Sequence, residues 1–95
     1  MLSEKDVNVP ARLTSSSRVA YPPEARRAEI EVDVPVQIVV DASGRVLEAR
    51  SLSHPGYGLD EAAAQAIRTW RFSPAQRAGR PVRVRMRWTV QFRLR

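Results

Sequence analysis

Residues 29–40 read EIEVDVPVQIVV, a stretch in which polar and apolar side chains alternate. Successive side chains of a strand point to opposite faces, so the apolar set from Ile30 to Val40 predicts a half-buried strand. Residues 41–44, Asp-Ala-Ser-Gly, then supply turn chemistry, with a glycine free to take a positive φ. We therefore expect a hairpin in which residues 45–53 return antiparallel.

Three further elements follow from the pattern outside this hairpin. Apolar residues recur at three-and-four spacing from Leu59 to Trp70, which predicts an amphipathic helix that ends before Ser73-Pro74. The period of two returns over residues 82–94 and predicts a long last strand of roughly 40 Å. Prolines followed by good helix formers predict a turn or two of helix over residues 21–28.

These elements assemble into a two-layer α+β fold. A right-handed crossover through the helix returns the last strand parallel to the second, which gives a three-stranded antiparallel sheet of order second, first, third. The main helix covers its apolar face. Pro35 lies in the central strand and lacks a ladder donor, so we expect a bulge or a shortened pairing there. Glu29, Glu31 and Asp33 are expected to lie opposite Arg93 and Arg95.

One edge of the last strand stays open in this arrangement, and an open edge can accept another chain. The arginines along this strand discourage indiscriminate stacking, but an extended and preferably acidic peptide would fit. Replacing Gln91 with proline is expected to abolish such binding if the Gln91 N–H lies on the open edge. Pairing of two copies of the chain through this edge stays open as an alternative.

Length and composition limit the classes of protein that fit. The chain has 95 residues, enough for one domain, which we predict over residues 21–95. Residues 1–20 are polar and aperiodic and are expected to form a flexible linker or tail. The chain has no cysteine, which excludes disulfides and thiolate metal sites. It shows no signal-peptide layout near Met1, and its apolar runs are too short to cross a bilayer.

The charge is concentrated in the second half of the chain. Sixteen Lys and Arg against ten Asp and Glu give a formal net charge of +6, and residues 62–95 contain no acidic residue. Such a surface attracts nucleic acid, anionic lipid, acidic glycans or acidic peptides alike. The arginine stripe is either a solvated face or a binding site, and charge alone does not decide between them.

The placement of the aromatic residues and the single histidine argue against two classes of protein, nucleic-acid binders and enzymes. Trp70, Phe72, Trp88 and Phe92 fall among core positions, whereas single-strand nucleic-acid binders present aromatics on an exposed basic face, so a nucleic-acid partner is disfavoured. His54 is expected in an exposed loop, with serines and Asp60 merely near it in sequence. We therefore predict no enzyme activity and no cofactor or metal site.

Several motifs together resemble the TonB C-terminal domain family. The resemblance covers residues 21–94 and rests on Tyr21-Pro22-Pro23-Glu24-Ala25, the hairpin of residues 36–46, Leu59-Asp60-Glu61-Ala62-Ala63, and residues 66–75, which read AIRTWRFSPA. It implies a periplasmic domain joined through a linker to an inner-membrane anchor and driven by a proton-powered motor complex.

The resemblance also implies a binding site on an envelope partner. An extended segment of an outer-membrane transporter is expected to add to the edge of the last strand, with help from residues at the Tyr-Pro motif. Carried over by position, the site consists of Arg18, Val19, Ala20, Tyr21, Pro22, Arg85, Arg87, Thr89, Gln91 and Arg93. Tyr21 could equally act as a hydrophobic staple over the short helix.

The sequence departs from the family pattern in two places. Glu29 and Val32 stand where glycines are usual at the start of the first strand, and Val19-Ala20 replaces the common Gln-Pro before Tyr-Pro. Partner choice therefore stays open among uptake, motility and export machines. The remaining alternative is a basic sheet that docks on an anionic envelope polymer, whose binding would weaken steeply with salt.

Overall fold

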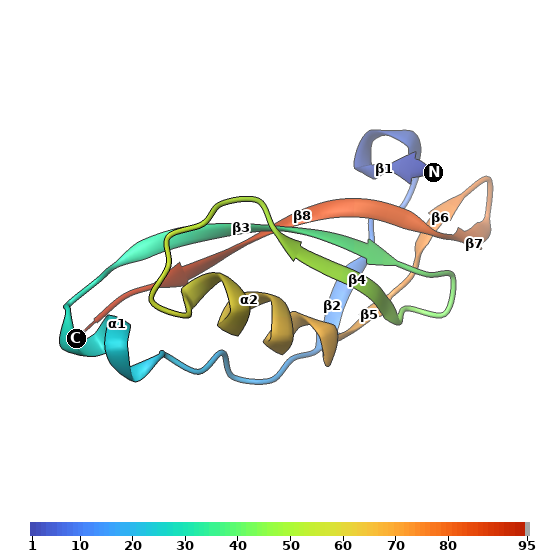
Figure 1. Ribbon diagram of the computed structural model, residues 1–95. Coiled ribbons are helices and arrows are strands. Elements are labelled where there is room, and N and C mark those ends of the chain that lie inside the picture. The colour runs from blue at the N-terminus through green and yellow to red at the C-terminus, as the bar shows by residue number, and fades with distance from the viewer. Residues whose placement is uncertain (95) are drawn as a thin grey trace.

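Strand β3 (Val32–Val40) is the centre of the fold because every second side chain along it is apolar. Val34, Val36, Ile38 and Val40 are fully buried. The computed structural model describes residues 1–94, and in it β3 pairs antiparallel with β8 (Val84–Phe92) on one side and β4 (Val46–Ser51) on the other (Figure 1). The predicted order of these three strands is confirmed.

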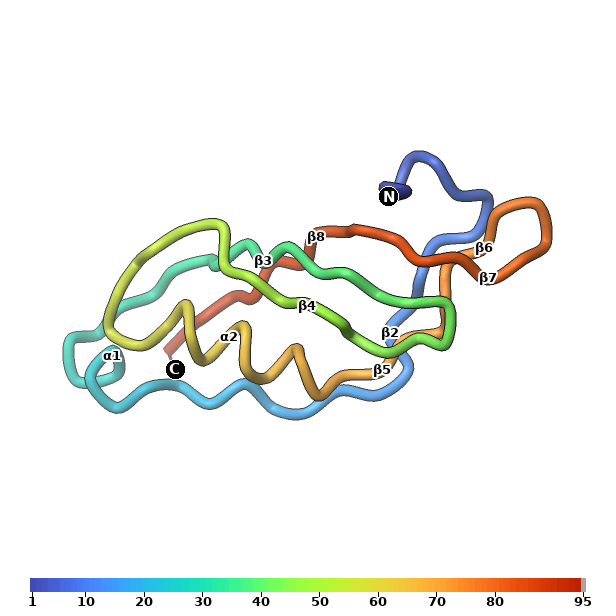
Figure 2. Tube along the Cα trace, turned by 45° about the vertical axis from the view of Figure 1, so that its right-hand side comes forward, coloured from blue at the N-terminus to red at the C-terminus, as the bar shows by residue number. Residues whose placement is uncertain are grey.

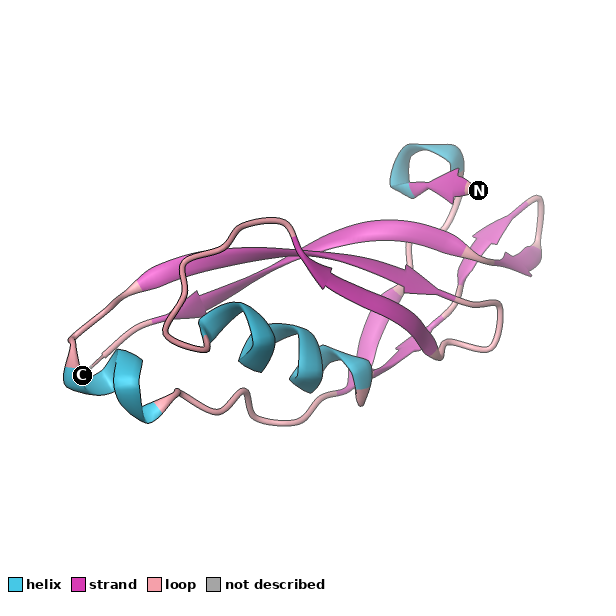
Figure 3. Cartoon of the chain, in the orientation of Figure 1, coloured by secondary structure: helices cyan, strands magenta, loops and turns pink. Residues whose placement is uncertain are grey.

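Helix α2 (Leu59–Arg68) covers one face of the sheet and gives the fold its second layer (Figures 1 and 3). Its apolar stripe is buried against the strands through Leu59, Ala63 and Ile67. Helix α1 (Pro23–Arg27) lies at one end of the elongated molecule, which measures 48 × 21 × 20 Å. The predicted α+β class and both predicted helices are therefore confirmed.

The main helix and the last strand are both shorter than their sequence patterns suggested. Thr69 caps α2, so Trp70 lies beyond the helix and Arg71 begins strand β5 (Arg71–Ser73). The pattern of residues 82–94 is interrupted at Arg83, where the chain leaves a hairpin of β6 (Ala75–Arg77) and β7 (Arg80–Val82). The nine residues of β8 therefore span roughly 30 Å rather than 40 Å.

Pro35 sits where the pairing between β3 and β4 ends. That pairing runs from Val36 to Val40, and next to it the Leu52 N–H donates to the Pro35 carbonyl at 2.8 Å. Pairing with β8 continues past Pro35, which lies opposite Thr89. The expected shortening is confirmed on the β4 side, because the missing N–H of Pro35 faces the side where β4 has already stopped. The β-bulge of this pair lies elsewhere and on the other strand: Val39 pairs with Glu48 and Val40 with Val46, so Leu47 of β4 is the extra residue.

Residues 1–20, expected as a linker without regular structure, differ from that expectation. They contain β1 (Leu2–Ser3), a 3₁₀ turn η1 (Glu4–Asp6) and β2 (Arg12–Ser15). β1 pairs in parallel with the start of β8, so the main sheet of the described residues has the order β1-β8-β3-β4 and extends the predicted three-stranded antiparallel sheet by one parallel strand. β2 pairs antiparallel with β5 (Figure 2). Strands this short carry no readable period, because their pairing depends on partners far along the chain. The division of the chain at residue 20 stays a prediction.

The turn between β3 and β4 forms as its residue types indicated. Asp41 Oδ1 accepts hydrogen bonds from the Ser43 N–H, the Ser43 hydroxyl and the Arg45 N–H. These bonds, led by the one from the Ser43 hydroxyl, hold the pKa of the Asp41 carboxyl below its ordinary value. Gly44 has a φ of +89°, and its carbonyl accepts from the Phe72 N–H at 2.9 Å. The turn therefore also fastens the hairpin to β5.

Candidate functional site

The direction of the backbone groups of β8 follows from Pro35. The Pro35 carbonyl points towards the β4 side, and successive residues of a strand turn their backbone groups to opposite edges. The N–H and C=O groups of Val34 and Val36 therefore point towards β8. Antiparallel pairs alternate between bonded and non-bonded, so Val90 and Trp88, opposite these two valines, turn their N–H and C=O groups inward. The residues between them turn these groups outward, to the free side of β8.

The residues of β8 whose backbone groups face the free side are those that the family resemblance indicates. They are Arg85, Arg87, Thr89 and Gln91, with Arg93 next beyond the end of the strand. Strand β1 lies opposite Val84 and Arg85, and no other strand pairs with this edge in the part of the chain that the structure describes. The backbone of Arg87, Thr89 and Gln91 therefore forms a free strand edge.

A groove of about 1240 Å³ lies along the C-terminal part of this edge. It is lined by Arg18, Val19, Ala20, Tyr21, Arg26, Glu29, Glu31, Val90, Gln91, Phe92, Arg93 and Leu94. The structure thus brings together the predicted residues before and at the Tyr-Pro motif with those at the end of the last strand. Pro22, Arg85, Arg87 and Thr89 do not line the groove; Pro22 precedes α1, and the other three lie further back along β8.

The wall opposite β8 is an extended segment held in place by α2 and its C-terminal end. The Trp70 Nε1–H donates to the Ser17 carbonyl at 3.2 Å, and the hydroxyls of Ser17 and Thr69 lie 3.0 Å apart. At the other end, Pro22 lies beside Gly58, the residue before α2. The segment therefore runs along α2, as Figures 1 and 2 both show.

Tyr21 is a groove residue that also has a structural role. Its ring packs edge-on against Phe92 with centroids 5.4 Å apart, and its hydroxyl donates to the Ile30 carbonyl. The Arg26 guanidinium carbon lies 5.4 Å from the ring centroid, within the range of a cation–π contact. Tyr21 thus ties the wall segment, α1 and β8 together while it also lines the groove.

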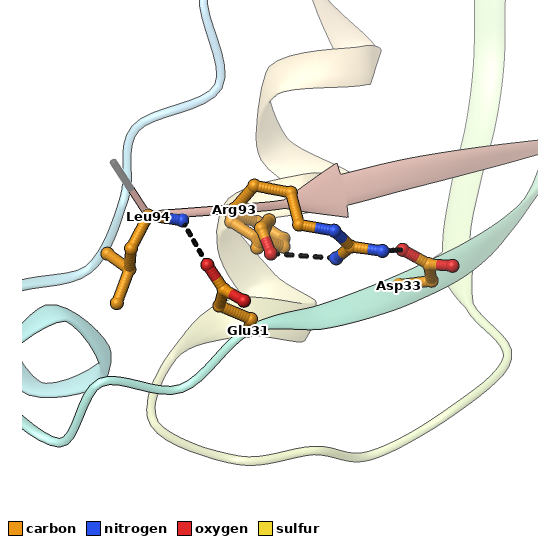
Figure 4. A network of polar contacts seen from close by, with 5 residues as sticks. Glu31, Asp33, Arg93 and Leu94 are labelled. Atoms are coloured by element: carbon orange, nitrogen blue, oxygen red, sulfur yellow. Dashed lines mark hydrogen bonds and ion pairs between the residues drawn. The ribbon is translucent and has the colours of Figure 1, made fainter.

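An ion pair fixes the end of β8 against the start of β3. Arg93 Nη2 lies 2.6 Å from Asp33 Oδ1, and the Leu94 N–H donates to Glu31 Oε2 at 2.7 Å (Figure 4). The predicted opposition is confirmed for Asp33 and Arg93. Glu31 accepts from the Leu94 backbone instead of an arginine, Glu29 has no arginine within ion-pair distance in the described chain, and Arg95 lies outside the described residues. The two ion-pair side chains are about half exposed, so the pair contributes only about 0–1 kcal/mol.

The groove's remaining arginines keep their charge available. Within residues 1–94, Arg93 is the only arginine or lysine with a carboxylate oxygen within 4.0 Å. Arg18 and Arg26 in the groove and Arg87 on the edge therefore present unpaired positive charge. Sequence reasoning missed Arg26 as a groove residue, although its place on a short helix just after Tyr21 was a usable signal.

Glu29 explains one departure from the family pattern. It has a φ of +55°, a left-handed conformation that usually takes glycine. It follows the end of α1, where the Ile30 N–H donates to the Ala25 carbonyl at 2.9 Å. The chain therefore keeps the glycine-type backbone at this position with a glutamate, and Glu29 is one of the residues that line the groove.

The histidine region lacks the geometry of a catalytic site. The side chain of His54 is 86% exposed, as expected for a loop, and its Nδ1 lies 3.8 Å from Asp60 Oδ2. The Ser51 hydroxyl donates to the Ser53 carbonyl instead of meeting the imidazole. Among residues 1–94 no three His, Cys, Asp or Glu side chains gather as a metal site would need, and no helix there is long and apolar enough to span a membrane.

Comparison with known proteins assigns the family. The family described as Gram-negative bacterial TonB protein C-terminal matches residues 17–94. The chain belongs to the TonB C-terminal family. It is 36% identical to Protein TonB of Vibrio cholerae over 89 residues, and 33% identical to Protein TonB of Xanthomonas campestris pv. campestris over 94 residues. These alignments cover 93% and 98% of the chain but only 36% and 38% of the relatives.

A solved structure supports the same assignment. The solution NMR structure of the Pseudomonas aeruginosa TonB C-terminal domain superposes with a TM-score of 0.70 at 25% identity, over 88% of this chain and 86% of that one. The TonB C-terminal match begins at residue 17, which is where the groove wall is anchored to Trp70. The family region therefore includes both walls of the groove.

Proposed function

We propose that this TonB C-terminal domain binds an extended segment of an outer-membrane receptor, which adds as a strand to the outer edge of β8 between Arg87 and Arg93. The observation that carries the proposal is the free row of backbone groups at Arg87, Thr89 and Gln91, which leads into a groove walled by residues 18–21. An added strand would satisfy these groups by main-chain hydrogen bonds, which give affinity for many sequences.

The two faces of the edge set the kind of side chain that fits. An incoming strand places alternate side chains on the two faces of the sheet. On one face they meet the half-buried Trp88 and the apolar Tyr21 and Phe92, and on the other the exposed Arg87 and Gln91. The segment should therefore alternate apolar with acidic or polar residues.

The larger role is that of an energy transducer. As a TonB-type module, the domain would lie in the periplasm, joined to an inner-membrane anchor and a proton-driven motor complex through parts of a longer protein. It would pass force to the receptor through the added strand, and it would have no enzyme activity and no cofactor. The relatives named Protein TonB extend well beyond the region they share with this chain, which fits a terminal domain of a longer transducer.

Two other uses of the same edge are compatible with its chemistry. Two copies of the domain could pair β8 with β8, because a free edge accepts any strand that approaches it. An anionic envelope polymer could also meet the arginines. That second reading is weaker, because Trp70, Phe72 and Phe92 are buried and leave no exposed ring on the basic face for stacking.

The test uses a proline on the edge and an alanine as its control. Gln91→Pro removes the outward N–H without breaking a bond to β3, because the backbone groups of Gln91 face away from that strand. Gln91→Ala keeps the N–H and loses only the side chain. We expect a peptide from the periplasmic end of a receptor to bind Gln91→Ala like the wild type and to lose at least about tenfold in affinity for Gln91→Pro.

Amide NMR titrations would report both the affinity and the place of binding. Shifts gathered on residues 85–93 and 17–22 support strand addition. Equal affinities for the two variants, with the fold intact, would move the site away from this edge. Strong shifts with an anionic polymer and none with any peptide would favour the polymer instead.

A further inference from the structure

The free edge of β8 is not its whole outer edge. β8 has nine residues, and β1 covers the two positions Val84 and Arg85. Seven positions, Met86–Phe92, are left for another strand. The chain therefore occupies part of its own acceptor surface with its first residues.

The occupying segment is attached weakly. Leu2 and Ser3 are half-buried, the rest of residues 1–6 are exposed, and none of the six belongs to the hydrophobic core. A hollow of about 420 Å³ separates Ser3, Glu4 and Lys5 from Gln37 and residues 85–87 of the sheet. Pairing of two residues over an incomplete contact can be lost without opening the core.

The segment is also a discrete unit. The Ser3 N–H and hydroxyl both donate to Asp6 Oδ2 at 2.9 Å, so its own hydrogen bonds stay within it when it moves. Firm attachment to the rest of the molecule begins immediately afterwards. The Asn8 N–H donates to the Gln76 carbonyl at 2.8 Å, and Asn8 Oδ1 accepts from the Ala78 N–H at 2.7 Å. Residues 1–6 can therefore leave β8 while residue 8 onward stays in place.

We propose that residues 1–6 are an internal competitor for the strand-acceptor edge, and that an extended partner segment long enough to reach Val84 displaces β1. This inference rests on the strand docking proposed above. With β1 in place, the edge accepts a segment of about seven residues; with β1 released, it accepts one that matches all nine. Affinity for long segments is then reduced by the fraction of molecules in which β1 is closed.

A reversible lock gives the cleanest test. Ser3 and Arg85 are direct partners across the β1–β8 pair, and neighbouring strands bring such residues within disulfide range. In the double variant Ser3→Cys/Arg85→Cys, oxidation pins β1 to β8 and reduction frees it, so one protein serves as its own control. The probes are two synthetic peptides of alternating valine and glutamate, one of seven residues and one of nine.

We expect the reduced form to bind the nine-residue peptide about three- to tenfold more tightly than the oxidised form, and both forms to bind the seven-residue peptide equally. A chain lacking residues 1–6, which loses no core residue, should bind the nine-residue peptide at least as tightly as the reduced form. It provides the same comparison with the full chain if the double variant does not fold.

The outcomes separate the two proposals. Equal affinity of oxidised and reduced forms for the nine-residue peptide, with both peptides bound at the β8 edge, overturns the competition and leaves strand docking standing. If neither peptide binds the reduced or the shortened protein, strand docking itself fails and the competition falls with it.

Discussion

Gly44→Ala should be the most damaging glycine substitution in the hairpin region, and the structure indicates how much free energy of unfolding it costs. Gly44 has a φ of +89°, where an L residue costs roughly 1–2 kcal/mol. A Cβ at this position would also lie 1.8 Å from the Phe72 carbonyl oxygen, so β5 must move away. That movement endangers the bond from the Phe72 N–H to the Gly44 carbonyl, worth about 0.5–1.5 kcal/mol net. We expect a total loss of about 1.5–3.5 kcal/mol.

Gly79→Ala is the matched control. Gly79 has a φ of +76°, but a Cβ there would meet nothing within 4 Å, so only the backbone cost of roughly 1–2 kcal/mol applies. Both variants change the unfolded chain equally. Urea unfolding followed by tryptophan fluorescence should therefore place the midpoint of Gly44→Ala below that of Gly79→Ala by about 0.5–1.5 M, at an m-value of about 1 kcal/mol/M. Coincident midpoints would refute the close approach of β5 to the turn.

Three further substitutions test the site and its supports. Glu29→Gly should raise stability by up to about 1 kcal/mol in thermal unfolding, because it relieves the left-handed backbone at φ +55°; a lower Tm would contradict that strain. Tyr21→Phe keeps the ring on Phe92 but removes the donor to the Ile30 carbonyl, so urea unfolding should show a loss of about 0.5–1.5 kcal/mol while peptide affinity in NMR titrations is unchanged. Asp41→Asn should lower the Tm at neutral pH. Because folding lowers the pKa of Asp41, the stability that its carboxylate contributes is present above the ordinary pKa and is lost as pH falls through the lowered one. The difference in Tm between wild type and Asp41→Asn should therefore shrink below about pH 4. A difference that stays constant with pH would contradict this role of the carboxylate.

The sequence was sufficient for the central sheet and its helix because those elements carry their own periods. Every second residue of β3 is apolar, and the same alternation buries the Val90 side chain on β8. The backbone groups of β8 alternate too, so those of Val90 face β3 and those of Gln91 face outward. The residues of the candidate edge come from the family resemblance, which leaves the outward direction of the Gln91 N–H as a condition. The structure supplies that direction through Pro35, whose carbonyl accepts from the Leu52 N–H on the β4 side.

The parts that pattern could not supply depend on distant partners. β1 is two residues long, and nothing in Leu2-Ser3 indicates that it lies beside Val84 and Arg85. The end of α2 was overextended because Trp70 continues the helical spacing, although its indole instead reaches the Ser17 carbonyl. Glutamate itself gives no sign of the left-handed backbone at position 29, and the glycine usual there in the family was the available signal for it.

The two edges of the sheet differ in a way that explains why docking is expected on β8 rather than β4. Gln37 and Val39 point their backbone groups at β4, so Ala49, which lies between their partners, turns its carbonyl outward. Arg68 at the end of α2 donates to that carbonyl at 3.1 Å, which places a guanidinium across the β4 edge. A charged side chain over an edge obstructs strand addition. On β8 the arginines project from the face of the sheet and leave the backbone edge clear beyond β1. Within residues 1–94, the sheet edge that stays open to a partner is therefore also the edge that attracts an acidic segment.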